Sequence, residues 1–422
     1  MKYQVFKSEI NGTLKMIPSK SLTHRALISA ALAKGESIIE NPLYADDTLK
    51  TLEILKNLGA SFLTHLDYIK VAGGNIKHSN VVLFAKESGS TIRFLIPVAL
   101  LTEELEHFSL SPSLASRPFF VYEHLFKEHN IHFEKKGEDI FVKGPIYSGD
   151  YNIDGSISSQ FISGLLFVLP ILEGDSKIIV RNNFESKSYV ELTINVLKKF
   201  GIKINMAENI IYIEGGQQYK NTQFTVEGDY SQAAFYLASA ALGGSVTLLG
   251  LTKDSLQGDK KILEFLKEFG ANVIVKDKEV TVEKGECRKV DIDISDTPDL
   301  GPILFVLGAL SEEEFKISGI ERLRYKESDR IKAMLENLDK VNAKYKLEEN
   351  MITFYPSKLK GGIEVSSYND HRICMALTIL ASHLKEGLII DGIESVSKSY
   401  PTFFEDFNIL GGKYATVKNE NH

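Results

Sequence analysis

The sequence of 422 residues contains few cysteines, no long apolar run and no excess of positive charge. Its two cysteines, Cys287 and Cys374, are too few for a disulfide framework or a metal cluster, and we expect both to be reduced residues in or near a core. No segment approaches the roughly 18 apolar residues of a membrane span, and residues 1–7 lack the apolar stretch of a secretion signal. The formal net charge of −7 argues against non-specific binding to nucleic acid. We therefore expect a soluble, cytoplasmic protein with neither a membrane nor a nucleic acid as partner.

The composition that remains is that of a globular protein, with 43% hydrophobic and 25% charged residues. A chain of this length is too long for one ordinary hydrophobic core. Two domains are therefore expected.

A Gly or Asn recurs at nearly regular intervals, each time after a helical run and before a short alternating strand. The successive intervals are 71, 71, 69, 72 and 69 residues. Gly and Asn tolerate the left-handed backbone that often ends a helix. We therefore expect a helix to end at each of six positions, namely Gly59, Asn130, Gly201, Gly270, Asn342 and Gly411.

A small polar residue stands 38 to 43 residues before each of these positions and precedes an apolar run. We expect these residues to open helices: Ser21, Ser90, Ser159, Ser231, Asp299 and Asp370. Several of the helices that follow are apolar on all sides, as in residues 26–33, 233–241 and 303–310. A helix of this kind must be buried, so we expect sheets around it.

Within one repeat the pattern predicts strand, helix, strand, helix and two paired strands. In the third repeat these elements fall at residues 151–153, 158–172, 177–180, 189–200, 203–205 and 210–213. Pro97 and Pro170 predict that two helices kink or end early. Six such repeats predict an α/β protein with two similar domains, each of three βαβαββ repeats with buried helices surrounded by sheets, an inside-out α/β barrel.

The strand near residues 3–6 precedes the first complete repeat, and we expect it to join the last one. The chain would then cross between the domains near residues 16–18 and 227–229. This places one continuous domain at residues 18–227 and one discontinuous domain at residues 1–17 plus 228–422, with the active site expected in the cleft between them.

Cationic side chains stand at the predicted helix openings, where the backbone amide groups already make the field positive. There are seven of them: Lys20, Arg25, Arg117, Lys326, Arg330, Arg372 and Lys398. Taken singly, each is equally well explained as a solvated charge. If they converge they repel one another strongly without a ligand, and their natural ligands would carry both phosphate and carboxylate groups. Lys326 and Arg330, four residues apart, are predicted on one helix face, where they would repel each other unless an anion or the intervening acids compensate.

Uncharged polar residues accompany these cations. Gly89 would let a ligand oxygen approach the backbone. The hydrogen-bonding groups at two further openings suit a hydroxylated ligand, although helix capping explains the serines equally well; they are Ser158, Ser159, Gln160, Ser186 and Tyr189. Asp299 adds a carboxylate at a helix start, a position where Asp is normally structural.

These motifs, in this order, resemble the 5-enolpyruvylshikimate-3-phosphate synthases (3-phosphoshikimate 1-carboxyvinyltransferases), members of the enolpyruvyl transferase family. The resemblance runs essentially end to end, over Ser19-Lys20-Ser21, Arg117-Pro118, Ser158-Ser159-Gln160, residues 326–330, residues 369–372 and Lys398. The family fold has two domains of three βαβαββ units. The resemblance implies transfer of the enolpyruvyl group of phosphoenolpyruvate to the 5-hydroxyl of shikimate 3-phosphate, on the shikimate pathway to chorismate and the aromatic amino acids. Phosphate would leave through a tetrahedral intermediate, in a monomeric enzyme without metal or cofactor.

The resemblance also implies roles for individual residues. The shikimate 3-phosphate ligands would be Lys20, Ser21, Arg25, Ser158, Ser159, Gln160, Ser186, Tyr189, Asp299 and Lys326. The phosphoenolpyruvate phosphate would be bound by Lys20, Arg117 and the Gly89 amide, and its carboxylate by Arg330, Arg372 and Lys398, with Gln160 between the two substrates. Asp299 would engage the attacking hydroxyl, Glu327 would be the acid near the methylene carbon, Lys20 would donate a proton to the leaving phosphate, and His371 would support the site.

Four residues depart from the usual family pattern: Pro18, Glu87, Ser90 and Arg322. We expect the Glu87 side chain to point away from the phosphate. Gly89 leaves room for the inhibitor glyphosate, so we expect sensitivity to it.

Other classes of protein share parts of this pattern. The sister enzyme that acts on UDP-N-acetylglucosamine usually carries a Cys before the Arg-Pro motif, whereas residues 111–116 here contain none. An RNA terminal phosphate cyclase has related repeats but fits the acidic balance poorly. A non-catalytic repeat scaffold would place its polar residues on exposed faces rather than at helix openings.

Overall fold

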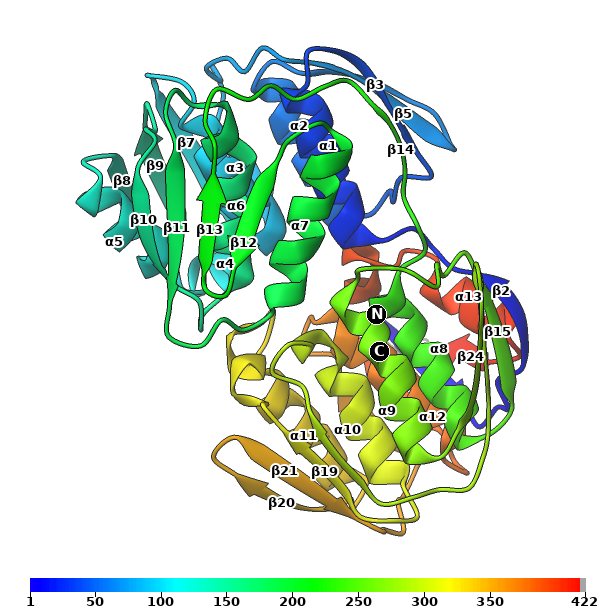
Figure 1. The fold of residues 1–422 in the computed structure, drawn as a ribbon. Helices are drawn as coiled ribbons and strands as arrows, with labels where there is room; N and C mark the ends of the chain where they lie inside the picture. Colours follow the sequence, from blue (N-terminus) through cyan, green and yellow to red (C-terminus); the bar gives the residue numbers. More distant parts are fainter. Residues whose placement is uncertain (418–422) are drawn as a thin grey trace, which may run out of the picture. The chain divides into compact units, whose positions relative to one another are not determined.

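The computed structural model describes residues 1–417, which form two compact units. Among the described residues, unit 1 comprises residues 1–17 and 228–417, and unit 2 comprises Pro18–Glu227 (Figure 1). The chain passes from one unit to the other twice, near residues 17–18 and 227–228, and in each unit a backbone hydrogen bond joins the two segments that lead to these crossings. Ser19 N donates to Glu227 O at 2.8 Å in unit 2, and Asp229 N donates to Ile17 O at 2.9 Å in unit 1.

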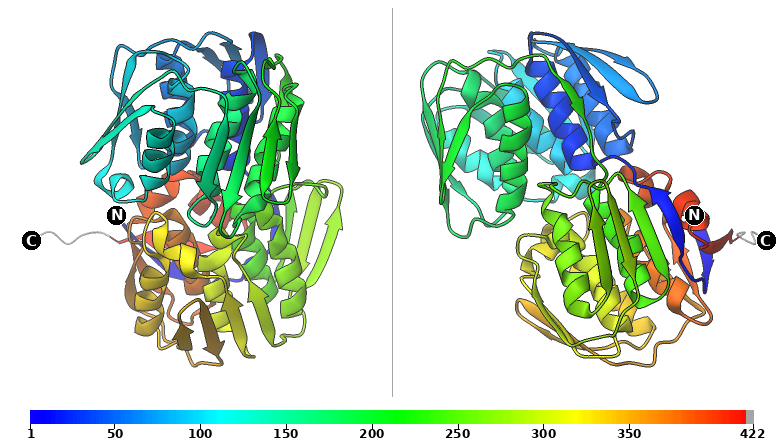
Figure 2. Two further views of the ribbon diagram at one scale, coloured as in Figure 1. Left: turned by 60° about the vertical axis from the view of Figure 1, so that its left-hand side comes forward. Right: turned by 45° about the vertical axis from the view of Figure 1, so that its right-hand side comes forward.

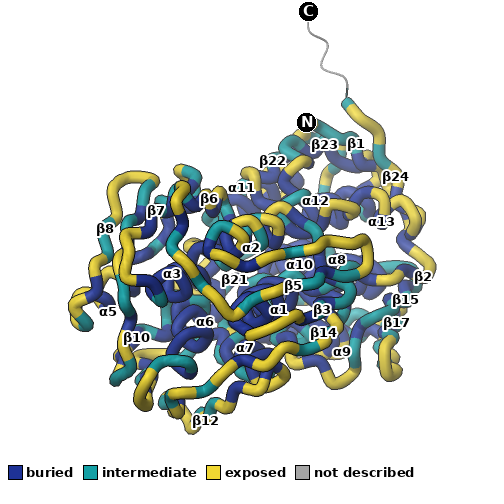
Figure 3. Tube along the Cα trace, turned by 90° about the horizontal axis from the view of Figure 1, so that it is seen from above, coloured by how far each residue is buried: buried dark blue, intermediate teal, exposed yellow. Residues whose placement is uncertain are grey.

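Three apolar helices form the centre of unit 2: α1 (Lys20–Leu32), α3 (Gly89–Ala99) and α6 (Ser159–Val168). Nearly all of their side chains are buried, and Figure 3 draws these helices largely in the buried colour. A second helix follows in each repeat: α2 (Asp46–Asn57), α5 (Phe120–Glu128, after the single turn α4, Pro112–Ala115) and α7 (Lys187–Lys199).

Three four-stranded sheets enclose these helices in the described part of unit 2 (Figure 2). In each sheet the first two strands are parallel and the other pairs are antiparallel. Their orders are β14 (Gln223–Thr225)-β3 (Gly35–Glu40)-β5 (Tyr68–Gly73)-β4 (Ser61–Thr64), β6 (Leu83–Lys86)-β7 (Leu105–Leu110)-β9 (Asp139–Lys143)-β8 (His132–Lys136), and β10 (Asp150–Asp154)-β11 (Ser176–Arg181)-β13 (Ile210–Ile213)-β12 (Ile204–Ala207).

Unit 1 repeats this plan. Its central helices are α8 (Tyr230–Leu242), α10 (Gly301–Leu310) and α12 (His371–His383), and its second helices are α9 (Ile262–Phe269), α11 (Arg330–Lys340) and α13 (Phe403–Ile409). Its sheets, over the described residues, are β2 (Gly12–Lys15)-β15 (Ser245–Leu249)-β17 (Glu279–Glu283)-β16 (Asn272–Lys276), β18 (Val290–Asp293)-β19 (Phe315–Ser318)-β21 (Met351–Tyr355)-β20 (Lys344–Glu348), and β22 (Ile363–Ser366)-β23 (Leu388–Asp391)-β1 (Lys2–Phe6)-β24 (Lys413–Thr416). The prediction that the first strand joins the last repeat is confirmed, because β1 pairs with both β23 and β24.

The predicted fold class is confirmed, and so are the helix ends on which it was built. All six of the recurring Gly and Asn residues have a left-handed backbone, with φ between 55° and 105°. The proline predictions also hold. Helix α6 ends at Val168, and Pro170 lies in the 3-10 turn η1 (Leu169–Ile171), whereas α3 ends two residues after Pro97.

The predicted helix openings are correct at Ser159, the first residue of α6, and at Asp370, the cap of α12, and they are one or two residues away from the helix start at the other four positions. The capping side chains of α1, α3 and α8 belong to Ser19, Ser88 and Asp229, two residues earlier than expected. The cap of α6 is Ser158. Asp299 lies in the 3-10 turn η3 (Pro298–Leu300) before α10 and does not cap that helix. Ser21, Ser90, Ser159 and Ser231 therefore lie inside first turns, because the cap is the residue whose side chain accepts from the amide two or three positions on.

Cys374 is buried in α12 and Cys287 is half-buried, and both are free thiols. Burial raises the pKa of the Cys374 thiol to about 12. Among residues 1–417 every helix is too short or too polar to cross a lipid bilayer.

Candidate active site

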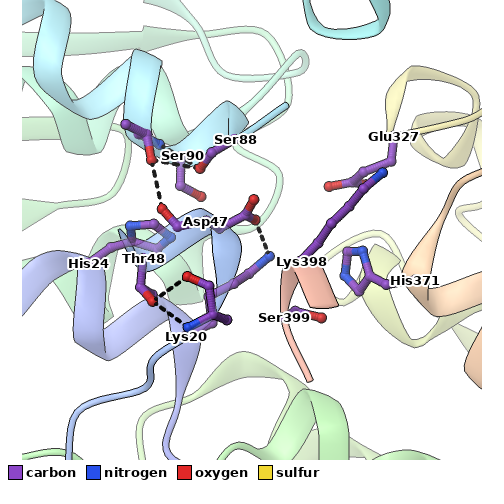
Figure 4. Close-up of polar contacts among 12 residues, drawn as sticks. Lys20, His24, Asp47, Thr48, Ser88, Ser90, Glu327, His371, Lys398 and Ser399 are labelled. Atoms are coloured by element: carbon purple, nitrogen blue, oxygen red, sulfur yellow. Dashed lines mark hydrogen bonds and ion pairs between the residues drawn. The ribbon is translucent and has the colours of Figure 1, made fainter. Parts of the chain in front are cut away.

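In unit 2 the first turn of α1 presents Lys20, whose ammonium forms an ion pair with the first turn of α2. Lys20 Nζ lies 2.8 Å from Asp47 Oδ2, and the two side chains point toward each other (Figure 4). Both side chains are largely buried, with exposed fractions of 13% and 12%. An ion pair at this depth fixes the direction of the lysine, because few other directions would satisfy both charges.

Arg25 lies one turn further along α1 and is almost fully buried. Its guanidinium donates to three neutral oxygens: Thr193 Oγ1 at 2.8 Å, Ser21 O at 2.9 Å and Tyr189 O at 3.3 Å. It also lies 5.0 Å from the centre of the Phe94 ring. Burial lowers the pKa of Arg25 to about 10. No carboxylate of the described residues forms an ion pair with it, so the structure provides a buried positive charge without an internal anion.

Four of the residues singled out from the sequence meet at the start of α3. A side-chain carbon placed on Gly89 would lie 3.1 Å from Arg117 Nη1, 3.3 Å from Arg93 Nη1 and 3.7 Å from Gln160 Oε1. Gln160 accepts from Arg93 Nη1 at 2.8 Å and donates to Ser90 Oγ at 2.9 Å. Two guanidinium groups thus flank a bare backbone, an arrangement suited to a phosphate or carboxylate.

The remaining polar residues of unit 2 lie at the starts of α6 and α7. Ser158 caps α6 by accepting from Gln160 N at 3.3 Å, so its hydroxyl has the structural role that the sequence left open. Ser159 is buried in the first turn. Ser186 precedes α7 with a left-handed backbone, φ 51°, and does not cap that helix through its side chain. Such backbone strain in a non-glycine residue is frequent at binding sites.

In unit 1 Asp299 is the centre of a charged cluster. Its Oδ1 lies 3.2 Å from Lys326 Nζ and 3.0 Å from Arg330 Nη1, and its Oδ2 lies 3.4 Å from Arg372 Nη2. Burial raises the pKa of Asp299, but the charges of Arg372, Lys326 and Arg330 outweigh it and hold that pKa well below the usual range. Burial likewise lowers the pKa of Lys326, against the attraction of Asp299.

Arg330 is fully buried and bound by three carboxylates. Besides Asp299, it donates through Nη2 to Glu327 Oε2 at 2.6 Å and through Nε to Asp370 Oδ2 at 2.8 Å. Burial lowers the pKa of Arg330, but Asp370, Glu327 and Asp299 more than reverse this, so its pKa lies above that of free arginine. In this structure the Arg330 guanidinium therefore binds three carboxylates of the protein itself.

One sequence prediction about these cations is wrong. Lys326 and Arg330 do not share a helix face, because Lys326 ends the 3-10 helix η4 (Glu321–Tyr325) and α11 begins only at Arg330. Of the two sources of compensation that the sequence allowed, the structure shows acids, because Asp299, Glu327 and Asp370 supply the charges opposite to Lys326 and Arg330.

The other predicted residues of unit 1 surround the start of α12. The His371 ring is buried, with its Nδ1 4.0 Å from Asp370 Oδ1. Lys398, at the end of the 3-10 helix η5 (Ile393–Lys398), donates to Asn369 O at 2.5 Å. Unit 1 therefore brings together Asp299, Lys326, Glu327, Arg330 and Arg372, and the loop that carries Lys398 is tied to the residue before Asp370.

Sequence reasoning missed three residues of these clusters. Arg93 carried a signal, a lone cation within the apolar run of α3. Asp370 was recognised as a helix opening but not as the partner of Arg330. Asp47 carried no signal, because an acidic residue in the first turn of a helix is common for electrostatic reasons alone.

The architecture is shared with solved structures. An EPSP synthase from Acinetobacter baumannii superposes with a TM-score of 0.81 at 23% identity, covering 98% of this chain and 100% of that one. The enolpyruvyl transferase NikO from Streptomyces tendae gives 0.80 at 15% identity, with 98% of each chain covered. The fold is thus that of the enolpyruvyl transferases.

Sequence similarity is more specific. The family model for EPSP synthase (3-phosphoshikimate 1-carboxyvinyltransferase) matches residues 6–407. The 3-phosphoshikimate 1-carboxyvinyltransferases of Clostridium acetobutylicum and Clostridium perfringens are 45% and 43% identical over 412 residues, covering 96% of this chain and 96% and 97% of theirs. The chain belongs to the EPSP synthase family of enzymes, whose members are enolpyruvyl transferases of the shikimate pathway.

Proposed function

We propose that this chain transfers the enolpyruvyl group of phosphoenolpyruvate to the 5-hydroxyl of shikimate 3-phosphate and releases inorganic phosphate. Family membership supports the reaction, and the charged clusters of the two units support the residue roles. Both substrates are multiply anionic, and the cations of both units would bind them. The proposal therefore includes that the two clusters act on one pair of substrates, as expected of a site in the cleft between two domains.

The observation that carries the proposal is the buried Arg25. Its three hydrogen-bond acceptors are neutral, and burial lowers its pKa to about 10. A phosphate group would supply the missing counter-charge, and neighbouring hydroxyl groups would bind the hydroxyls of a cyclic polyol. We assign shikimate 3-phosphate to this side, with Lys20, Ser21, Arg25, Ser158, Ser159, Gln160, Ser186 and Tyr189 from unit 2 and Asp299 and Lys326 from unit 1.

We assign the phosphate of phosphoenolpyruvate to Lys20, Arg117 and the Gly89 amide. The Gly89 backbone can approach a ligand because it carries no side chain, and Arg117 and Arg93 lie beside it. We assign the carboxylate of phosphoenolpyruvate to Arg330, Arg372 and Lys398, and His371 would support the loop beside them. Arg330 would have to exchange part of its carboxylate contacts for the substrate.

The chemistry needs one base and one acid in the first step. The 5-hydroxyl oxygen attacks C2 of phosphoenolpyruvate, its proton leaves to a base, and the methylene carbon C3 gains a proton from an acid. In the second step C3 loses a proton and the C2–O bond to phosphate breaks. Asp299 fits the base, Glu327 the acid at C3, and Lys20 the donor to the leaving phosphate.

The protonation of Asp299 depends on its cations. While Lys326, Arg330 and Arg372 surround it, its depressed pKa makes it a weak base. Substrate phosphate and carboxylate groups that draw these cations away would raise that pKa toward the range of a useful base. Substrate binding would thus prepare Asp299 for proton transfer.

A phosphate-release assay tests the proposed function. The purified chain is mixed with phosphoenolpyruvate and shikimate 3-phosphate, and separately with phosphoenolpyruvate and UDP-N-acetylglucosamine. Release only with shikimate 3-phosphate is expected, whereas release only with the sugar nucleotide would assign the chain to the sister reaction. Release with neither acceptor contradicts an enolpyruvyl transferase.

The proposal further includes a cytoplasmic monomer that uses neither nucleic acid nor a membrane. The net charge of −7 supports the absence of a nucleic-acid partner, because it disfavours binding to polyanions. Sedimentation equilibrium tests the oligomeric state: a mass near 47.1 kDa supports the monomer, and twice that mass contradicts it.

A further inference from the structure

Asp47 connects the site lysine to a buried network of hydroxyl groups in unit 2. Its side-chain Oδ2 lies 2.8 Å from Lys20 Nζ. Its backbone oxygen lies 3.2 Å from Thr91 Oγ1, on the first turn of α3. One residue thus contacts both the ammonium of α1 and the helix start that carries Gly89.

The network continues away from Asp47 in two directions. Thr91 Oγ1 lies 2.6 Å from Ser88 Oγ, the cap of α3, and 2.8 Å from Thr51 Oγ1 on α2. Thr51 Oγ1 lies 2.8 Å from His24 Nδ1 on α1. Thr51, Thr91 and His24 have no exposed surface, so these bonds do not compete with solvent.

The direction of the hydrogen bonds follows from counting protons. Thr91 has one hydroxyl proton, which goes to Asp47 O or to Ser88 Oγ. Thr51 must therefore donate to Thr91, and His24 Nδ1 must donate to Thr51. His24 is then a neutral imidazole with its proton on Nδ1, in agreement with burial and the charges of Lys20 and Arg25, which hold its pKa well below the usual range.

We propose that Asp47 is a positioning residue for Lys20 and that the chain His24–Thr51–Thr91 fixes Asp47 against the start of α3. The proposal rests on the proposed function, in which Lys20 and the Gly89 amide bind the phosphate group of phosphoenolpyruvate. Asp47 fixes the direction of the ammonium, while the hydroxyl chain fixes the distance between α2, which carries Asp47, and the Gly89 amide.

Asp47 has a second consequence for binding. Its carboxylate competes with the incoming phosphate for the Lys20 ammonium, so it opposes binding while it improves orientation. Removing the charge should therefore affect turnover and affinity differently. A residue that merely stabilises the fold would not separate them.

The decisive variant is Asp47→Asn, which keeps the size of the side chain and removes its charge. In steady-state phosphate release kcat should fall about tenfold to a hundredfold, the cost of misplacing a catalytic group by about 1 Å. The KM for phosphoenolpyruvate should stay equal or fall. A kcat within twofold of the unaltered protein, or a KM that rises in proportion to the loss of kcat, overturns the proposal.

Thr91→Val tests the hydroxyl chain and replaces Asp47→Asn if that variant does not fold. It leaves the charge of Asp47 in place and removes the bond to the Asp47 backbone oxygen, together with the contacts of the Thr91 hydroxyl to Ser88 and Thr51. We expect kcat to fall about threefold to tenfold with no decrease in KM, a smaller displacement than that of a lost ion pair. Unchanged kcat in both Thr91→Val and Asp47→Asn contradicts the proposal.

Thr378→Val is the matched control, because Thr378 is also fully buried but its hydroxyl donates only to Cys374 O within α12. It should lower the melting temperature by no more than Thr91→Val does, because it removes one hydrogen bond rather than three contacts, and it should leave kcat and KM unchanged. If Thr378→Val lowers kcat as Thr91→Val does, the loss reflects general destabilisation and the proposal is wrong.

A binding experiment separates this proposal from the proposed function. Failure of the unaltered protein to release phosphate would contradict the function before any variant is compared. Calorimetric titration with inorganic phosphate needs no turnover. Phosphate should bind Asp47→Asn at least as tightly as the unaltered protein and should bind Lys20→Ala at least tenfold more weakly; weaker binding to Asp47→Asn overturns the role of Asp47.

Discussion

Arg330 and Asp370 form a two-pronged ion pair without any exposed surface. Arg330 Nε donates to Asp370 Oδ2 at 2.8 Å, and Nη2 donates to Oδ1 at 3.2 Å. The same carboxylate accepts from Ser328 Oγ and, as the cap of α12, from Arg372 N at 2.9 Å. Asp370 therefore holds α11, the loop before it and α12 together.

Asp370→Asn should destabilise unit 1 strongly. The change leaves a buried guanidinium with one carboxylate fewer, and breaking a buried pair in this way costs about 3–5 kcal/mol. Urea unfolding followed by circular dichroism measures the loss. Asp291→Asn is the control, because its pair with Lys316 is exposed and its removal should leave the unfolding free energy nearly unchanged. Equal effects of the two changes would contradict the structural weight given to Asp370.

The repeat architecture could be predicted because it depends on local backbone chemistry. Gly and Asn at regular intervals indicated left-handed helix ends, and all six have that backbone. Apolar helices such as α10 could be assigned to the interior because they lack a polar face. Helix starts were less accurate, because several small polar residues precede each helix and the sequence does not tell which one accepts the capping bond.

The pairing of charges could not be predicted, because it depends on side chains that are distant in the sequence. Asp47 is 27 residues from Lys20, and Asp370 is 40 residues from Arg330. The motifs indicated which cations belong to the site, but the distances between these cations and the carboxylates could not be predicted from the sequence. Unit 1 therefore contains a balanced cluster of cations and carboxylates, whereas Arg25 in unit 2 is buried and forms no ion pair with a carboxylate of the described residues.

Arg25→Met should separate stability from binding. Replacing a buried cation by an apolar side chain of similar length removes a desolvation cost and three hydrogen bonds, so the unfolding free energy should change by less than about 2 kcal/mol. Binding of shikimate 3-phosphate, measured by calorimetry, should weaken at least a hundredfold, since a charge-assisted contact to phosphate is lost. Arg181 is exposed on β11, and Arg181→Met should bind shikimate 3-phosphate as tightly as the unaltered protein does. Normal binding by Arg25→Met would place the phosphate elsewhere.

Gly89→Ala should weaken binding of phosphoenolpyruvate without unfolding the chain. The added carbon would lie 3.1 Å from Arg117 Nη1 and 3.3 Å from Arg93 Nη1, so these groups would have to shift. We expect the KM for phosphoenolpyruvate to rise about tenfold, together with the inhibition constant of glyphosate if that inhibitor competes with phosphoenolpyruvate, because displaced donors lose about 1–2 kcal/mol.

Gly243→Ala provides the comparison for Gly89→Ala. Gly243 has an extended backbone, φ 176°, and a carbon added there meets only His383, at 4.0 Å. The KM of Gly243→Ala for phosphoenolpyruvate should equal that of the unaltered protein. Indifference of the unaltered protein to millimolar glyphosate would overturn the expected sensitivity but not the predicted change of KM.

Glu327→Gln should abolish most turnover and leave the fold intact. The amide oxygen can still accept from Arg330, but the side chain can no longer give a proton to the methylene carbon. Loss of an acid catalyst costs about 10²–10⁴ in kcat. The rate of phosphate release is the measurement. Glu321→Gln is the control, because Glu321 is an exposed residue of η4. A normal rate in Glu327→Gln would assign the proton to another group.

His383 makes the stability of unit 1 depend on pH at a position outside the charged clusters. Burial lowers its pKa from 6.5 to about 4, with smaller contributions from the charges of Lys284 and Lys7. Its Nε2 lies 3.1 Å from Ser239 Oγ. The folded state therefore favours the neutral ring, whereas the unfolded chain takes up a proton near pH 6.5.

The resulting stabilisation is complete above pH 6.5 and is lost as the pH falls from 6.5 toward 4, because over that range the unfolded state binds more protons. The loss attributable to His383 should reach about 2–3 kcal/mol. Urea unfolding at pH 7.5 and pH 4.5 should show a smaller decrease for His383→Gln than for the unaltered protein. The exposed His132→Gln should follow the unaltered protein at both values, and identical decreases in all three proteins would mean that His383 is protonated as readily in the folded state as in the unfolded chain.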